Sequence, residues 1–399
     1  GKKLFENFIE INMIEDMLSD RLFAEVRTVE DFYLQISMLA GDKMQEKANT
    51  LIFIDEIQAY PHLLTLLKFL AQDGKFTFIA SGSLLGVTLS KTSSIPMGSI
   101  RKVRMFPLDF EEFLYANGIN KFAISIMRKK FELEESLDEA THNKMMDLFR
   151  KYLLVGGMPE AAEAYIDTGD LIESREILKD LYDNYLADME LYQASPESVI
   201  RSRALFSNIY SELNKENKNF TPGLIKEHSR TRDYLTSIQW LTTAHIVNCS
   251  FQLKEHITMP LIRDETGGFR LFLADIGMFS YQSGINSASF ISNERENTLS
   301  GIFFENFAAN ELTAKGHKLF YWRSKTTAEL EFIVESDNKL YPIDVKKGKG
   351  ALNSLAKFSN GNSFEFAVKV SKNNYGYNAE NKIMTVPFYF LPFVAEDLA

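Results

Sequence analysis

The chain has 399 residues, of which 45% are hydrophobic and 25% charged, so it is long enough to bury more than one core. Its net charge of −10 argues against a protein that nucleic acid covers over its whole surface, and its single cysteine, Cys249, excludes an internal disulfide. Neither a signal peptide nor an apolar span long enough to cross a bilayer is visible, so we predict a cytoplasmic protein that does not enter a membrane.

The N-terminal part alternates between strand and helix signals. Residues 7–12 alternate apolar and polar side chains, as strands do, and residues 28–39 repeat apolar side chains at helical spacing behind a capping threonine. Further along we expect a buried strand over residues 51–54, a helix that starts near Pro61, and a second buried strand over residues 76–80. Because strands and helices alternate, the pattern predicts a parallel sheet.

Two carboxylates, Asp55 and Glu56, end the first buried strand. They fall at the carboxyl edge, where open α/β sheets place their ligands. In nucleoside triphosphate hydrolysis, the first acid of such a pair helps to hold Mg²⁺ and the second orients the attacking water. The alternative is structural: Asp55 caps the helix that begins near Pro61, and Glu56 faces solvent. The two interpretations are equally compatible with this short motif.

Further candidates follow the second buried strand. Ser81 or Ser83 is expected beside the two acids, where its hydroxyl would contact a γ-phosphate or the attacking water. Arg101 and Arg104 are the nearest candidates for an arginine that offsets the charge of the transition state. The sequence thus predicts a nucleotide site built from the ends of neighbouring strands.

The pattern then changes to helices. Residues 110–192 repeat leucine and methionine at helical spacing, and a turn at residues 156–159 interrupts them. No group of histidines has ligand spacing, so we propose no zinc site. The closing stretch, residues 386–391, is so apolar that we expect a strand there, with Pro387 favouring an edge position.

Residues 204–279 have another rhythm. A helix, a turn, a second helix over residues 234–244 and then two strands predict a winged helix-turn-helix. In a DNA-binding protein, the polar side chains of Arg232, Thr236 and Gln239 would face the major groove. The acidic surroundings favour the alternative, in which this element packs between domains or binds another protein.

Several motifs occur in a fixed order along almost the whole chain. They are Phe53–Gln58, Leu67–Phe69, Ile79–Ser83, Phe106–Phe113, Gly156–Glu160, Ala274–Gly277, Gly301–Asn306 and Tyr321–Arg323. In these motifs the sequence resembles the AAA-superfamily ATPases of bacteria and archaea that carry a C-terminal domain of unknown function. The resemblance implies ATP and Mg²⁺ as ligands, with Asp55 at the metal. It places the nucleotide next to Asp55, Ser81, Ser83 and Arg101.

One element of that family is missing from these 399 residues. Its members begin with a phosphate-binding loop of the form G-x-x-x-x-G-K-[ST], whose backbone amides and lysine hold the phosphates. Here Gly-Lys occurs at residues 1–2, 74–75 and 348–349, and neither Ser nor Thr follows in any of the three. We therefore expect this chain to bind ATP poorly or not at all, and a longer parent to bind it.

A second candidate site lies near the C-terminus. Strand alternation over residues 340–346 puts Asp344 and Lys346 on one face, and pairing with residues 328–334 as a hairpin would bring Glu331 close to both. Glu305, on a preceding helix, adds a further carboxylate. Carboxylates that hold Mg²⁺ or Mn²⁺, together with a lysine that positions water, are what a metal-dependent phosphodiesterase needs.

This spacing is similar to that of the PD-(D/E)XK nuclease superfamily, with Asp344-Val345-Lys346 as its (D/E)XK element. The resemblance implies that Glu331, Asp344 and Lys346 are catalytic and that Glu305, Glu331 and Asp344 are metal ligands. The sequence departs from the family pattern, because the earlier acid is usually Asp and the later one often Glu. The alternative is an amphipathic hairpin whose polar face is solvated.

Together these features predict a multi-domain α/β protein with four parts. They are a partial AAA-type ATPase core with a truncated parallel sheet (1–115), a helical segment (116–200), a winged-helix-like part (201–286) and a PD-(D/E)XK-like α/β domain (287–399). Three functions remain open: an ATPase coupled to nucleic-acid binding or processing, a regulatory or interaction scaffold with degenerate enzyme folds, and a Mg²⁺-dependent nuclease. The expected partners are ATP, DNA or other nucleic acid, and proteins, with a homo-oligomer as a further option.

Overall fold

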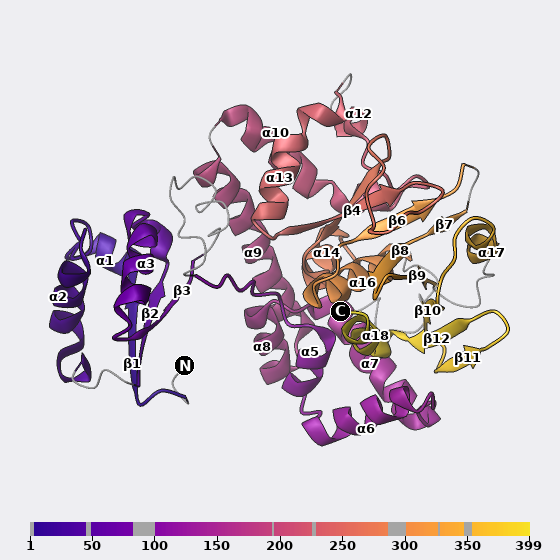
Figure 1. Ribbon diagram of the computed structural model, residues 1–399, viewed down its shortest axis with the longest axis horizontal. Coiled ribbons are helices and arrows are strands. Elements are labelled where there is room, and N and C mark those ends of the chain that lie inside the picture. Colours follow the sequence, from indigo (N-terminus) through magenta and orange to yellow (C-terminus); the bar gives the residue numbers. More distant parts are fainter. Residues whose placement is uncertain are drawn as a thin grey trace. The chain divides into compact units, whose positions relative to one another are not determined.

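The computed structural model describes residues 4–44, 49–82, 100–193, 195–225, 229–285, 301–325, 328–346 and 353–399. The chain forms two compact units, Gly1–Met105 and Phe106–Ala399, whose helices and strands are labelled in Figure 1. None of the helices in these ranges has the length and hydropathy needed to traverse a bilayer.

The first unit is built on a three-stranded parallel sheet. Its strands are β1 (Asn7–Asn12), β2 (Thr50–Asp55) and β3 (Thr77–Ala80), and β2 lies in the middle. The register pairs Asn12 with Asp55 and Ile54 with Ala80, so all three strands end at one edge. The helices are α1 (Met13–Leu18), α2 (Val29–Ala40) and α3 (His62–Asp73). The predicted parallel sheet of the first unit is confirmed.

Two local features fix the chain around this sheet. Thr28 accepts a hydrogen bond from the Asp31 N–H, and the Asp31 carboxylate accepts one from the Thr28 N–H, which forms a capping box at the start of α2. The buried Asp16 carboxylate accepts hydrogen bonds from the Phe23 N–H at 3.2 Å and from the Tyr60 hydroxyl at 2.8 Å. Tyr60 lies just beyond the acids of β2, so Asp16 anchors the segment that follows them.

The second unit contains helices along most of its length. They are α5 (Phe110–Ala116), α6 (Lys121–Glu132), α7 (Glu139–Val155), α8 (Pro159–Thr168), α9 (Leu171–Tyr192), α10 (Pro196–Ser207), α11 (Ile209–Leu213), α12 (Pro222–Ile225), α13 (Leu235–Thr243), α14 (Ile276–Gln282), α16 (Ile302–Ala314), α17 (Asn353–Ser359) and α18 (Leu391–Asp397). Long helices therefore fill residues 110–192, where the sequence predicts them.

Two sheets complete the second unit. One has the order β5-β4-β6-β7, formed by Phe269–Leu273, Val247–Leu253, Phe320–Arg323 and Glu329–Leu330. The other has the order β11-β12-β10-β9-β8, formed by Gly376–Asn378, Ile383–Pro387, Ala367–Ser371, Lys339–Val345 and Phe332–Ser336. The strand expected over residues 328–334 is divided, because β7 pairs with β6 and β8 pairs with β9. Glu331 stands between them, where the chain passes from one sheet to the other.

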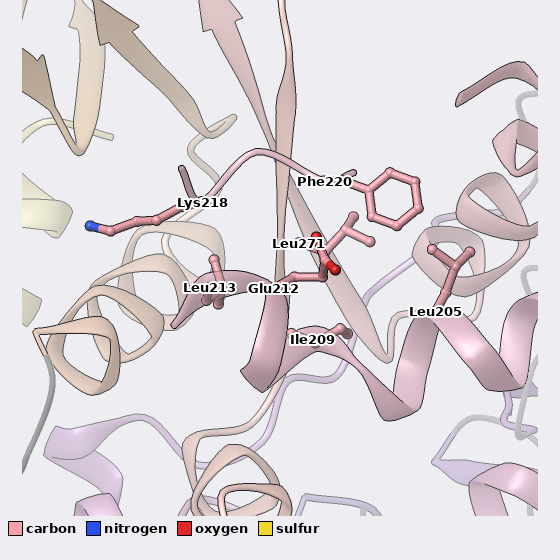
Figure 2. Close-up of a pocket in the computed structure, with 7 residues that line it drawn as sticks. All are labelled: Leu205, Ile209, Glu212, Leu213, Lys218, Phe220 and Leu271. Atoms are coloured by element: carbon pink, nitrogen blue, oxygen red, sulfur yellow. The ribbon is translucent and has the colours of Figure 1, made fainter. Parts of the chain in front are cut away.

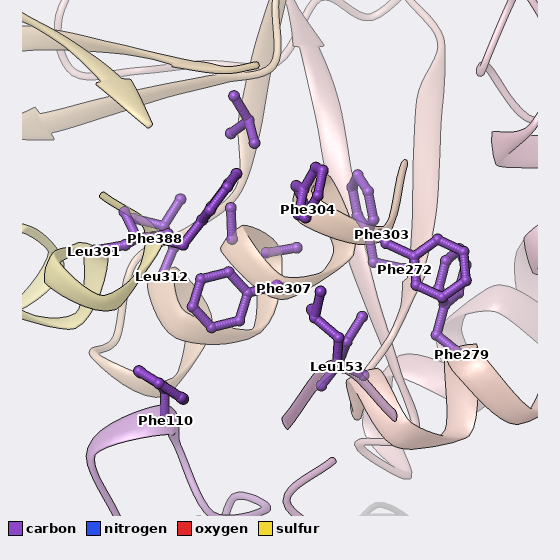
Figure 3. Packing of buried hydrophobic residues seen from close by; sticks show 14 of the residues in the cluster. Phe110, Leu153, Phe272, Phe279, Phe303, Phe304, Phe307, Leu312, Phe388 and Leu391 are labelled. Atoms are coloured by element: carbon purple, nitrogen blue, oxygen red, sulfur yellow. The ribbon is translucent and has the colours of Figure 1, made fainter. Parts of the chain in front are cut away.

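Helix α16 lies in the middle of the largest core (Figure 3). It is apolar on most sides, as a fully enclosed helix is, and Phe303, Phe304 and Phe307 are all buried. The Phe304 ring stacks on Phe388 with the centroids 4.4 Å apart. The strand expected over residues 386–391 is wrong beyond Pro387, because Phe388–Phe390 form a 3₁₀ turn that leads into α18. Pro387 ends β12, where it pairs with Ser371 of β10, and the pairing with β11 covers only Ile383–Thr385.

Candidate functional site

The first candidate site lies at the carboxyl edge of the parallel sheet. The Ser81 hydroxyl donates a hydrogen bond to Asp55 Oδ1, although 26 residues separate them. The backbone supports this contact: the Ser81 N–H donates to the Ile54 carbonyl at 2.8 Å, and the Ile57 N–H donates to the Ser81 carbonyl at 3.1 Å. The ends of β2 and β3 are thereby joined, and the hydroxyl is directed at the first acid.

Glu56 has an unusual backbone conformation. Its φ is +52°, in the left-handed region that non-glycine residues rarely adopt. The Glu56 N–H donates to Asp55 Oδ1 at 3.1 Å, and the Gln58 amide donates to the Glu56 carboxylate. Gly82 leaves room for the Gln58 amide, because a Cβ there would lie 2.0 Å from Gln58 Oε1. A residue held in a costly conformation next to a candidate ligand edge often has a functional role.

Among the described residues, the structure does not join the predicted nucleotide residue Arg101 to this edge. Arg101 is exposed in an irregular segment, and no hydrogen bond or ion pair joins it to Asp55 within the described ranges. Ser83 lies outside the described residues. Asp55 Oδ2 has no hydrogen-bonding partner among the described residues, so this oxygen is available for a Mg²⁺ ion that accompanies a nucleotide.

The second candidate site joins three of the predicted residues. Lys346 Nζ lies 2.8 Å from Asp344 Oδ1 and 3.2 Å from Glu331 Oε1. The remaining Glu331 oxygen accepts a hydrogen bond from the Val345 N–H at 3.2 Å. Both acids are buried, with exposed fractions of 6% for Glu331 and 3% for Asp344. This burial excludes the alternative in which the polar face that carries Glu331 and Asp344 is simply solvated.

Two cations that sequence reasoning missed complete the cluster. Lys218 Nζ lies 2.5 Å from Glu305 Oε1 and 3.9 Å from Glu329. Arg270, which is 1% exposed, lies 2.6 Å from Glu329 and stacks its guanidinium over the Tyr321 ring at 4.0 Å. Arg270 has a sequence signal, since it interrupts the apolar strand β5. Lys218 has none, because it lies in a polar loop.

Burial raises the pKa values of the acids in this cluster, and the neighbouring cations lower them. Burial and the neighbouring Asp344 raise the pKa of Glu331 to about 7. Burial likewise raises the pKa of Glu305, although Lys218 opposes the shift. For Glu329 burial also acts upward, but Arg270 outweighs it and holds the pKa below its usual value. The carboxylates of this cluster are thus neutralised largely by the lysine and arginine side chains next to them.

The donor set of this cluster does not fit a divalent cation as it stands. Among the residues that the structure describes, no group of three or more His, Cys, Asp and Glu side chains is arranged to hold a metal ion. One oxygen of Glu305 and both oxygens of Glu331 already accept from lysines or backbone, and Asp344 Oδ1 forms an ion pair with Lys346. Lysine ammonium groups occupy the positions where a metal would need open coordination.

A small apolar pocket lies beside Lys218 (Figure 2). Its lining residues are Leu205, Ile209, Glu212, Leu213, Lys218, Phe220 and Leu271. The Lys218 side chain extends away from Phe220 and Leu271 in this view. The pocket is thus a gap in the apolar packing under the loop that carries Lys218. The Lys218 ammonium group pairs with Glu305 in the carboxylate cluster.

The helix over residues 234–244 separates its apolar and polar side chains as the sequence predicts. Tyr234, Ile238 and Leu241 are buried in the second unit, and Arg232, Thr236 and Gln239 are exposed. The strands β4 and β5 follow and pair antiparallel. Helix and strands lie where the sequence places them, and their winged-helix assignment stays a prediction.

Comparisons with known families match three parts of the chain. Residues 1–114 match a family described as an AAA domain, and this match supports an AAA-type ATPase domain in the N-terminal part. Residues 146–289 and 300–390 match two families that are each described as a domain of unknown function, DUF8612 and DUF4143. No curated protein matches the chain. Among solved structures, a Walker-type ATPase of Pyrococcus abyssi is similar, with 12% identity, a TM-score of 0.39, and coverage of 70% of this chain and 84% of that one.

Proposed function

We propose that the protein is an AAA-type ATPase that couples nucleotide hydrolysis to nucleic-acid binding or processing. The observation that carries the ATPase part is the contact between Asp55 and Ser81 at the carboxyl edge of a parallel sheet, with Glu56 beside them. This is the edge at which open α/β sheets bind ligands. The match of residues 1–114 to the AAA domain supports the same assignment.

In this proposal each residue has a distinct task. Asp55 binds the cation through Oδ2 and is oriented by the hydrogen bond that Oδ1 accepts from Ser81. Glu56 orients the attacking water, and its left-handed turn fixes the direction of its carboxylate. When bound, ATP and Mg²⁺ supply the γ-phosphoryl group and the neutralisation of its charge. Phosphate binding by a glycine-rich loop would have to come from residues other than these 399.

The test is ATP turnover by the product of the complete reading frame and by its Asp55→Asn variant. We expect a loss of about 100-fold or more in kcat, since removal of one such electrostatic group typically costs that much. The matched control is Asp20→Asn, an exposed aspartate of the same unit that does not belong to the proposed site. Equal turnover by wild type and Asp55→Asn would refute the assignment. Tight ATP binding by the 399-residue chain alone in calorimetry would refute the separate expectation that these residues bind ATP poorly.

A second candidate function concerns the C-terminal cluster. We propose that this unit acts as a binding or regulatory scaffold and does not cleave nucleic acid in the state described here, because lysines already fill its carboxylate cluster. A Mg²⁺- or Mn²⁺-dependent nuclease is the competing function. Plasmid and single-strand degradation with either ion distinguishes them, since cleavage that Asp344→Ala abolishes would establish the nuclease.

The nucleic-acid part of the proposal has its own test. We propose that Arg232, Thr236 and Gln239 on α13 and the turn before it face nucleic acid. Anisotropy titrations with labelled duplex and single-stranded DNA should show binding that weakens with salt. Arg232→Glu should reduce the affinity and the salt dependence together. Binding that is insensitive to salt and to this change would favour a protein partner.

A further inference from the structure

Lys218 is held in place by its neighbours on both sides. The Arg323 guanidinium donates a hydrogen bond to Asn217 Oδ1 at 2.9 Å, and the Tyr321 hydroxyl donates one to Asn219 Oδ1 at 2.7 Å. Both donors belong to β6. The loop between α11 and α12 is thereby fastened to the sheet at two points that flank the lysine.

The surrounding backbone is shaped for this loop. The Phe220 N–H donates to the Phe269 carbonyl at 2.9 Å, which joins the loop to β5 as well. A Cβ on Gly268 would lie 2.3 Å from the Asn219 amide, so a glycine is needed for the close approach. A long, flexible side chain is usually placed so firmly only where its charged end has a specific partner.

That partner is Glu305 on α16. Lys218 Nζ lies 2.5 Å from Glu305 Oε1, and the lysine side chain is 19% exposed against 4% for the glutamate. The other oxygen, Oε2, is buried without a hydrogen-bonding partner. Leaving such an oxygen unsatisfied is costly, and a carboxylate oxygen of this kind is a strong ligand for a cation.

The charges of the cluster show what Lys218 contributes. Four carboxylates, Glu305, Glu329, Glu331 and Asp344, face three cations, Lys218, Arg270 and Lys346. Glu329 and the Glu331–Asp344 pair each have another cation, whereas Lys218 is the only one paired with Glu305 within the described residues. Its ammonium group is therefore the cation that neutralises Glu305 in this cluster.

We propose that Lys218 is a built-in cation that replaces a divalent metal in this carboxylate cluster and keeps the cluster closed to metal. The inference is independent of the ATPase assignment and rests on the nuclease-like arrangement of the second unit. Displacement of the loop from β6, or loss of the lysine charge, opens the cluster to Mn²⁺ or Mg²⁺. The residue determines which kind of cation the cluster holds.

The experiment titrates Mn²⁺ into the full chain and its variants by calorimetry and by electron paramagnetic resonance of the free ion. Lys218→Met removes the charge and keeps most of the side-chain volume. Lys215→Met is the matched control, because Lys215 lies in the same loop and pairs with Glu212 outside the cluster. Asn219→Ala loosens the loop and retains the lysine. Thermal unfolding of each variant verifies that it is folded.

We expect Lys218→Met to bind one Mn²⁺ at least about tenfold more tightly than wild type, since a positive charge next to the ion is lost. Asn219→Ala should show a smaller gain and Lys215→Met none. Adding Asp344→Asn to Lys218→Met should abolish the gained site. If wild type binds Mn²⁺ and Lys218→Met binds it equally well or more weakly, the inference is overturned, although the cluster would still be a metal site. Absence of binding in both proteins would overturn the inference and the nuclease alternative together, and neither result touches the ATPase assignment.

Discussion

Asp275 accepts a hydrogen bond from the Gly157 N–H at 2.7 Å, across 118 residues of sequence. Its other oxygen accepts from the Met278 N–H at 2.8 Å and so caps α14. The carboxylate is 2% exposed, and burial raises its pKa to about 6 in spite of these bonds. The two motifs Gly156–Glu160 and Ala274–Gly277 therefore meet in space, and their joint role is to lock α14 against the turn between α7 and α8.

We predict that Asp275→Ala destabilises the second unit by about 3 kcal/mol, because two buried N–H groups lose their acceptor. Asp170→Ala is the matched control. Asp170 also caps a helix, α9, but it is exposed, so its loss should cost only about 1 kcal/mol. Urea denaturation followed by near-ultraviolet circular dichroism compares them. Equal losses would show that the bond to Gly157 contributes nothing.

We predict a similar contrast between two glycines. Gly156 and Gly169 both have positive φ, +74° and +70°. A Cβ on Gly156 would lie 2.5 Å from Asp275 Oδ1 and from the Gly277 N, whereas nothing lies within 4 Å of one on Gly169. Gly169→Ala should cost about 1 kcal/mol from backbone strain alone, and Gly156→Ala at least twice as much. The measurement is the shift in the denaturation midpoint, and a cost for Gly156→Ala no larger than for Gly169→Ala would contradict it.

The left-handed turn at Glu56 gives a prediction for the first unit. Glu56→Ala and Glu56→Gly both remove the carboxylate, so both should lose ATP hydrolysis if Glu56 orients water. Only glycine adopts a φ of +52° without strain, and the glycine variant should be the more stable by about 1 kcal/mol. Hydrogen–deuterium exchange over β2 and β3 reports the difference. Slower exchange in the alanine variant than in the glycine variant would contradict the prediction, since it would show that alanine causes no strain at this turn.

The Glu331 carboxyl gives a prediction on pH. Its pKa is raised to about 7, first by burial and then by Asp344, so the folded state binds a proton that the unfolded state has released. Stability should therefore fall as pH rises from about 4.5 to about 7, by up to about 3 kcal/mol relative to Glu331→Gln. Carbon-13 NMR of the carboxyl group measures the pKa directly. Asp344→Asn should lower it, and no change in that variant would exclude charge repulsion as a cause.

Local patterns predicted the elements of the first unit closely. The alternation at residues 7–12 and the capping threonine at position 28 correspond to β1 and α2, because these signals depend on neighbours in sequence. The contact of Asp55 with Ser81 also followed from sequence, since parallel strands end at a common edge. By contrast, the short motif alone could not show that Glu56 adopts a left-handed backbone.

In the second unit, local patterns were less informative. Whether residues 328–334 form one strand or two depends on which partners β7 and β8 find, and those partners lie in different sheets. Lys218 and Arg270 reach the cluster from residues far upstream, and only Arg270 interrupts an apolar pattern. Residues 386–391 are apolar because they pack on α16, and burial of this kind is equally compatible with a strand, a turn or a helix.

The sheet β5-β4-β6-β7 has a consequence for how this protein can be divided. A cut near residue 286 would take β4 away from β6, Arg270 from Glu329 and Lys218 from Glu305. Residues 300–390, the part that matches a family by itself, would then expose a sheet edge and leave the buried Glu305 and the partly buried Glu329 without these cations. Gene fusion or recombination that keeps this region folded should therefore carry the preceding segment, from the Lys218 loop onward, as part of the same inherited block.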